Sequence, residues 1–137
     1  MFAPVTELLL TAQTPSYKTV LALDKKVRDK TLPSHFNTPA SIDDASFPSR
    51  AINRHLFVHL RTVCLMYIHR SFFARALLDH PTNPLRSPYA PSVLSAYQCA
   101  SLLIRDDVKF VEQMPDLAMR WSILWSHLFS AAVCGIC

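Results

Sequence analysis

The chain has 137 residues, a net charge of +4, an isoelectric point near 9.0, an apolar fraction of one half and a single glycine. This length fits one domain, and scarce glycine favours helices over a turn-rich β-protein and excludes a glycine-rich phosphate loop. The lysine and arginine residues are spread along the chain, whereas a DNA-binding surface needs them clustered, so direct DNA contact is not favoured.

The N-terminal part of the chain predicts a short helix. Residues 1–14 are apolar but lack the basic start of a signal peptide, and this abrupt beginning suggests a fragment of a longer protein. Ser16 is a suitable N-cap, and we expect an amphipathic surface helix from there that stops before Pro33. Its apolar positions are Val20, Leu21, Leu23 and Val27.

The longest predicted element is a helix from about Ser49 to His80. This stretch contains neither proline nor glycine, and it follows a proline-containing loop over residues 32–48. Apolar residues recur in it at helical spacing in a stripe wide enough to be contacted on more than one side, so we expect it to be the central helix. The stripe consists of Ile52, Leu56, Leu60, Val63, Tyr67, Ala74 and Leu78, with Phe57, Cys64, Ile68 and Phe72 beside them.

Two further helices are expected after the central helix. Residues 81–91 contain four prolines and predict a stiff, extended connector. A helix then begins between Tyr89 and Ser92 and ends at Pro115, with an apolar line of Val93, Tyr97, Ala100, Ile104, Val108 and Val111. Asp116 is expected to cap a final helix whose face is Leu117, Trp121, Leu124, Trp125, Leu128 and Ala132. The fold class is therefore all-α, with four to five helices around the central one in a single domain, residues 1–137, and no sheet.

The C-terminal stretch raises the question of a membrane anchor. Trp121 to Cys137 is seventeen residues without a formal charge, which is close to the lower limit of about 17 for a spanning helix. Serine residues and His127 within it favour a fully buried core helix instead. A small membrane-associated protein anchored by this stretch is the alternative, with its basic helices on anionic lipid.

Few residue patterns suggest chemistry. His55 and His59, four apart on one helix, could share a metal, but this helix supplies no third ligand, so we predict two histidines at a polar edge, one bonded to a carboxylate. The pair Cys134 and Cys137 lacks a second ligand pair. Adjacent Asp106 and Asp107 point about 100° apart and indicate a solvated face. With no nucleophile motif either, the expectation is a non-enzyme without catalytic or metal-binding residues; a helical enzyme domain completed elsewhere is a weaker option.

Two segments carry a family resemblance. Met66 to Ile104, MYIHRSFFARALLDHPTNPLRSPYAPSVLSAYQCASLLI, resembles part of the fungal-specific transcription factor domain, the helical regulatory region downstream of a zinc binuclear cluster. Pro15 to Pro33 is similar to a helix that precedes this block in the family. The resemblance implies a nuclear protein that regulates transcription through helix packing and contacts with protein partners, with the rest of its own regulatory domain or with a second copy. It implies DNA binding and zinc only for a six-cysteine motif that this sequence lacks.

Four large aromatic residues were considered as a binding site. Most aromatic residues in helices belong to the core, but some members of the resembled family respond to small molecules, and helical bundles place ligand pockets between helices. The hypothesis of an apolar ligand pocket therefore rests on Phe72, Phe73, Trp121 and Trp125.

Overall fold

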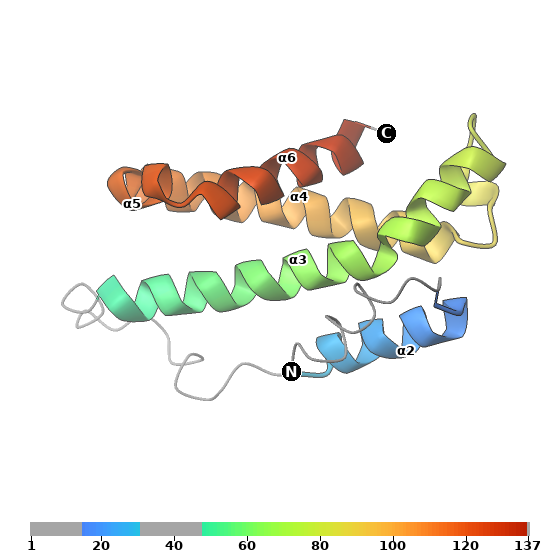
Figure 1. Cartoon of the computed structure of the whole chain (residues 1–137), viewed down its shortest axis with the longest axis horizontal. Helices are drawn as coiled ribbons and strands as arrows, with labels where there is room; N and C mark the ends of the chain where they lie inside the picture. The colour runs from blue at the N-terminus through green and yellow to red at the C-terminus, as the bar shows by residue number, and fades with distance from the viewer. Residues whose placement is uncertain (1–14, 31–47, 137) are drawn as a thin grey trace.

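The computed structural model describes residues 15–30 and 48–136, which form one helix in the first range and a series of helices joined by short turns in the second (Figure 1). Within these residues there is no strand, so the all-α prediction is confirmed. The elements are α2 (Tyr17–Arg28), α3 (Pro48–Asp79), the short 3-10 helix η3 (Pro84–Arg86), α4 (Ala90–Gln113), α5 (Pro115–Arg120) and α6 (Ser122–Ile136).

The long helix α3 lies at the centre of the arrangement, as predicted. It packs along α4, and α2 lies beside α3 and also reaches α4 through hydrogen bonds between Arg28 and Ser95 and between Tyr17 and Ser92. Helix α4 also contacts α6 and the short α5 (Figure 1). Helices α3 and α4 run antiparallel, because His59 near the start of α3 meets Asp107 late in α4, whereas His69 further along α3 meets Ser92 in the first turn of α4. Helices α2, α3, α5 and α6 all contact α4.

Helix α2 begins where the sequence predicts and is closed at both ends by side chains. The Ser16 hydroxyl accepts a hydrogen bond from the Thr19 backbone N–H at 3.2 Å, which satisfies one of the donors left unpaired at a helix start. At the other end, the Arg61 guanidinium on α3 donates to the Arg28 carbonyl at 2.7 Å. This second contact docks the end of α2 against α3 as well as capping it.

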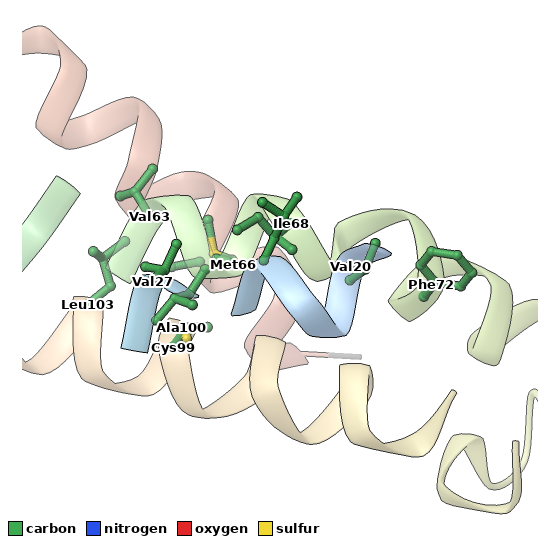
Figure 2. Packing of buried hydrophobic residues seen from close by; sticks show 12 residues of the cluster. Val20, Val27, Val63, Met66, Ile68, Phe72, Cys99, Ala100 and Leu103 are labelled. Atoms are coloured by element: carbon green, nitrogen blue, oxygen red, sulfur yellow. The ribbon is translucent and has the colours of Figure 1, made fainter. Parts of the chain in front are cut away.

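Two groups of buried apolar residues hold the helices together. The larger one joins α2, α3 and α4 with a contribution from α6, and it contains Val20, Leu23, Val27, Val63, Leu65, Met66, Ile68, Phe72, Cys99, Ala100, Leu103 and Ala131 (Figure 2). The smaller one lies between the end of α4 and the α5–α6 segment and contains Phe110, Ala118 and Leu124. Burial of these side chains supplies the main stabilisation of the packing.

The bounds of α4 were predicted closely and Ala100 on its predicted apolar line is fully buried, but other residues of that line are exposed. Tyr97 and Val108, both on the predicted apolar line, are 53% and 47% exposed. The face that packs against α3 and α6 instead includes Ser92, Ser95 and Asp107. The prediction counted apolar residues only and therefore missed these buried polar ones. As a result, the predicted face is rotated around the helix axis relative to the observed face.

Helix α3 shows the same difference between pattern and structure. Leu60 and Leu78 from the predicted stripe are 38% and 81% exposed, whereas His59 and His69 are 2% and 1% exposed. Both histidines can be buried because residues on other helices form hydrogen bonds with their ring nitrogens. The sequence pattern of α3 alone does not reveal these partners.

The single final helix that was predicted is two helices. Asp116 lies inside the first turn of α5 and does not cap it, and the chain leaves helical geometry at Trp121, whose ψ is 81°. The break is compensated by hydrogen bonds to the Ala118 carbonyl, which accepts the Trp121 N–H at 3.2 Å and the Trp125 indole N–H at 3.1 Å. Packing of the Trp121 ring against α3 and α4 therefore determines the end of α5.

The C-terminal helix is not the fully buried core helix that was expected. Ile123 is 54% exposed and Phe129 is 73% exposed, so α6 buries one side only. None of the described helices is both long and apolar enough to cross a bilayer.

The connector after α3 is compact and not extended. Its prolines support the 3-10 helix η3, in which the Asn83 side chain accepts a hydrogen bond from the Leu85 N–H at 3.2 Å. The predicted loop over residues 32–48 falls almost entirely outside the described residues, and its last residue, Pro48, opens α3.

Candidate functional site

Two histidines one turn apart on α3 form the base of a buried polar cluster. The spacing of four residues places His55 and His59 on the same side of the helix. The His59 side chain is fully buried and the His55 side chain is 14% exposed. His59 is thus a core residue and not the polar-edge residue that was predicted.

Asp107 on α4 supplies a carboxylate to both histidines. Its Oδ1 lies 2.9 Å from His59 Nδ1 and 3.2 Å from His55 Nε2, and its side chain is 1% exposed. The first contact is a hydrogen bond, which fits the prediction that one of these histidines bonds a carboxylate. The expectation that Asp107 lies on a solvated face is wrong, because the 100° turn between neighbouring helical residues leaves Asp106 at the surface and directs Asp107 inward.

Two polar atoms of this cluster have no hydrogen-bond partner. They are His55 Nε2, whose 3.2 Å approach to Asp107 lacks hydrogen-bond alignment, and the second carboxylate oxygen, Asp107 Oδ2. Both atoms are buried, and a buried polar atom without a partner carries a desolvation penalty of about 1–3 kcal/mol. The cluster therefore has unused capacity to bind a ligand.

His127 extends the cluster to α6. Its Nδ1 lies 2.9 Å from His59 Nε2, so Asp107, His59 and His127 form a hydrogen-bonded chain across three helices. The Asp107 carboxylate accepts a hydrogen bond from His59 Nδ1, and the second ring nitrogen of His59 makes the contact with His127.

The ionisation of the cluster follows from its surroundings. Burial alone would raise the pKa of Asp107, but the hydrogen bond with His59 and the adjacent His55 imidazole lower it. The pKa of His127 is lowered, first by burial and then by the neighbouring His59. The carboxylate is accordingly charged at neutral pH, and His127 is uncharged.

Aromatic rings enclose the cluster. The His55 ring stacks on Phe110 with centroids 4.0 Å apart and an interplanar angle of 4°. The Trp121 ring lies 5.3 Å from His59 and 6.3 Å from His55. These contacts fix the orientation of both imidazoles and shield the carboxylate from water.

A second polar network joins α2, α3 and α4. His69 Nε2 lies 3.0 Å from Asp24 Oδ1, and His69 Nδ1 lies 2.9 Å from Ser92 Oγ. These contacts connect serine, histidine and aspartate in the order of a hydrolase triad. Ser92 is completely buried, with the Tyr17 hydroxyl 3.4 Å from its oxygen, so this serine is not presented to a substrate from solvent. The network holds helices together.

Arginine completes this second network. The Arg28 guanidinium donates to both Asp24 oxygens at 2.9 Å and to the Ser95 hydroxyl at 2.6 Å. Burial would raise the pKa of Asp24, but the hydrogen bonds with Arg28 and His69 and their charges outweigh this and lower it. The carboxylate is therefore held ionised at the junction of three helices.

The four aromatic residues proposed as a pocket lie in different places. Phe72 packs between Tyr17 and Tyr89 in the larger apolar cluster, whereas Trp121 packs beside the histidines in the smaller one. Phe73 is buried and Trp125 is 43% exposed. The structure does not gather the four residues into one cluster, and ligand binding by any of them stays a prediction.

The cysteines in the helical core behave as small apolar residues. Cys99 is buried, Cys64 is half-buried, and burial raises the pKa of both thiols. The predicted Cys134 and Cys137 pair is only partly described, because Cys137 lies outside the described residues.

Comparisons of the chain with protein-family models, with curated proteins and with solved structures found no match.

Proposed function

We propose that this chain is a regulatory and interaction domain of the type found in fungal zinc-cluster transcription factors, and that it acts by helix packing and not by catalysis. The proposal rests on the resemblance of Met66 to Ile104 to that family, and the all-α architecture is compatible with it. In this proposal the protein is nuclear and DNA is bound by a separate six-cysteine motif, since this chain has four cysteines in all.

The observation that carries the interaction role is the outward face of α6. Trp125, Phe129 and Val133, spaced by four residues, follow one side of this helix and are 43%, 73% and 47% exposed. We call these three residues the α6 stripe. Large apolar side chains gathered on one exposed helix face are typical of contact surfaces between proteins.

The partner proposed for the α6 stripe is a second copy of the chain. No lysine, arginine, aspartate or glutamate occurs in Ser122–Ile136, so two copies can bring this helix together without repulsion, despite a net charge of +4 on each. A self-complementary stripe related by a two-fold axis is the commonest arrangement in homodimers.

The assignment to a transcription regulator is tested by the coding sequence upstream of this chain. We expect an in-frame six-cysteine cluster followed by a linker. A transcript that begins at Met1 and produces the chain by itself would contradict the regulator assignment, although it would leave the self-association proposal standing.

The interaction role has its own test. Static light scattering of the purified chain at tens of micromolar should give a mass that rises with concentration towards the dimer. A constant monomer mass over that range would overturn the proposal of a homodimer.

A further inference from the structure

The buried cluster of His55, His59 and Asp107 has the composition of a metal site. Two imidazole nitrogens and a carboxylate oxygen, one from each residue, lie within 4.8 Å of one another. Imidazole and carboxylate together suit zinc and other divalent transition metals. Asp107 is the third ligand that α3 does not itself supply, and it comes from α4.

We propose that this cluster binds one zinc ion through His55 Nε2, His59 Nδ1 and an oxygen of Asp107, and that the ion clamps α3 to α4. The buried, unpartnered His55 Nε2 is the independent sign of a ligand, because a metal would give this nitrogen a partner. A carboxylate that binds the metal through both oxygens would do the same for Asp107 Oδ2. This proposal departs from the sequence-based expectation of no metal in this segment, and it does not depend on the proposed function.

The spacing of the donor atoms fits a tetrahedral ion. Zinc bonds of about 2.0–2.1 Å to nitrogen and oxygen place neighbouring ligands about 3.3 Å apart in a tetrahedron. The separation of His55 Nε2 and Asp107 Oδ1 is 3.2 Å, and that of His59 Nδ1 and the same oxygen is 2.9 Å. Binding requires the second pair to open by a few tenths of an ångström, as the zinc ion replaces the Nδ1 proton of His59. It also requires the two imidazole nitrogens, which lie within 4.8 Å of each other, to come to about the same tetrahedral spacing.

The surroundings already provide the support that metal-bound histidines need. A ligating imidazole usually donates its other N–H to an acceptor, which fixes its tautomer. With zinc on Nδ1, His59 can donate its Nε2 proton to His127 Nδ1, which lies 2.9 Å away. His55 is held by its stack on Phe110. The 14% exposure of the His55 side chain leaves this edge of the cluster next to solvent.

The test is a zinc titration of the full chain in a Cys134→Ser and Cys137→Ser background, which removes the C-x2-C pair as a competing site. Zinc bound per chain is measured by metal analysis after dialysis, affinity by competition with a coloured chelator, and stability by thermal unfolding. We expect one zinc per chain and a raised unfolding midpoint. Cobalt in place of zinc should give visible bands without the near-ultraviolet band of sulfur ligation.

Two ligand variants and two comparison variants identify the site. Asp107→Asn and His55→Phe, the latter keeping the ring stacked on Phe110, should each weaken zinc binding on the order of 100-fold. His127→Phe should weaken it about 10- to 100-fold, which is the usual effect of losing a residue that supports a ligand. His80→Ala, beyond the far end of α3, should leave it unchanged.

Several outcomes would overturn the proposal. They are the absence of stoichiometric zinc in the folded chain, loss of binding on removal of the two cysteines, and binding that survives both ligand substitutions. If Asp107→Asn does not fold, as judged by circular dichroism, the partly exposed His55→Phe variant decides the question.

Discussion

At the scale of single residues, the most informative side chains are the buried polar ones. His69 is 1% exposed and Ser92 is fully buried, yet each has a partner on another helix. In a dry interior such pairs are stable when complete, and removing one partner leaves the other without a hydrogen bond. These residues therefore determine how the helices fit together and not only how firmly they pack.

Substitution of Ser92 tests this network. Ser92→Ala should lower the free energy of unfolding by about 1–3 kcal/mol, because His69 Nδ1 then has no partner in a buried position. Ser101→Ala is the matched control, since Ser101 is exposed on the same helix and its loss should change stability by less than about 0.5 kcal/mol. Urea unfolding measures both. Equal effects would show that the hydrogen bond to His69 contributes nothing.

Asp24 predicts a dependence of stability on acid pH. Its pKa is lowered on folding from the ordinary value of 3.8, so its contribution is present above pH 3.8 and is lost as the pH falls through the lower, folded-state pKa. In Asp24→Asn, unfolding midpoints measured from neutral pH down to about pH 3 should fall less steeply than in the wild type. Parallel curves would contradict this account. Asp107 titrates in the same direction in both proteins, so the comparison isolates Asp24.

At the scale of helices, the sequence predicted the positions of α2, α3 and α4 but not which of their faces are buried. Prolines and the Ser16 cap determined the bounds of α2, α3 and α4, because they act locally on the backbone. The buried faces depend on partners elsewhere in the chain. Asp107 faces inward because it contacts His55 and His59 on α3. The residues next to Asp107 in the sequence do not indicate this.

The break between α5 and α6 has the same explanation. The sequence around Trp121 contains no proline or glycine between Pro115 and Gly135, so nothing local predicts an interruption. The break follows from contacts of the Trp121 ring with His59 and Phe110, which belong to other helices. Local sequence signals therefore do not predict the end of a helix where tertiary packing determines the backbone conformation.

A pair of neighbouring residues tests the orientation of α6. Leu124→Ala should destabilise the protein by about 2–5 kcal/mol, because Leu124 is fully buried and its truncation leaves a cavity. Ile123→Ala, one position earlier and 54% exposed, should cost well under 1 kcal/mol. Guanidinium unfolding compares the two variants. A larger loss for Ile123→Ala would mean that the observed face of α6 is wrong.

Only the two histidines of the candidate metal site could be identified from the sequence. The spacing of His55 and His59 marks a possible ligand pair on a helix, and it was recognised as such. The contributions of Asp107 and His127 were not predictable, because they lie 48 and 68 residues from His59 and reach it only through the packing of α3, α4 and α6. Only a three-dimensional arrangement could show the complete cluster.

At the scale of the whole molecule, two polar networks lie along the contact between α3 and α4. One joins α2 to this pair through Asp24, His69 and Ser92, and the other joins α6 to it through Asp107, His59 and His127. Both outer helices are thus held in defined positions on the central pair. This arrangement keeps the outward face of α6, with its stripe of apolar side chains, available to a partner.

The central claim is that the chain associates through the α6 stripe, and light scattering of surface variants tests it most directly. Phe129→Lys combined with Val133→Lys places positive charges at two of the three positions of the α6 stripe, whereas Leu78→Lys changes an equally apolar residue, 81% exposed, at the end of α3. At tens of micromolar we predict a dimer for the wild type and for Leu78→Lys, and a folded monomer for the double variant. A wild-type monomer, or a dimer that persists in the folded double variant, would contradict the account.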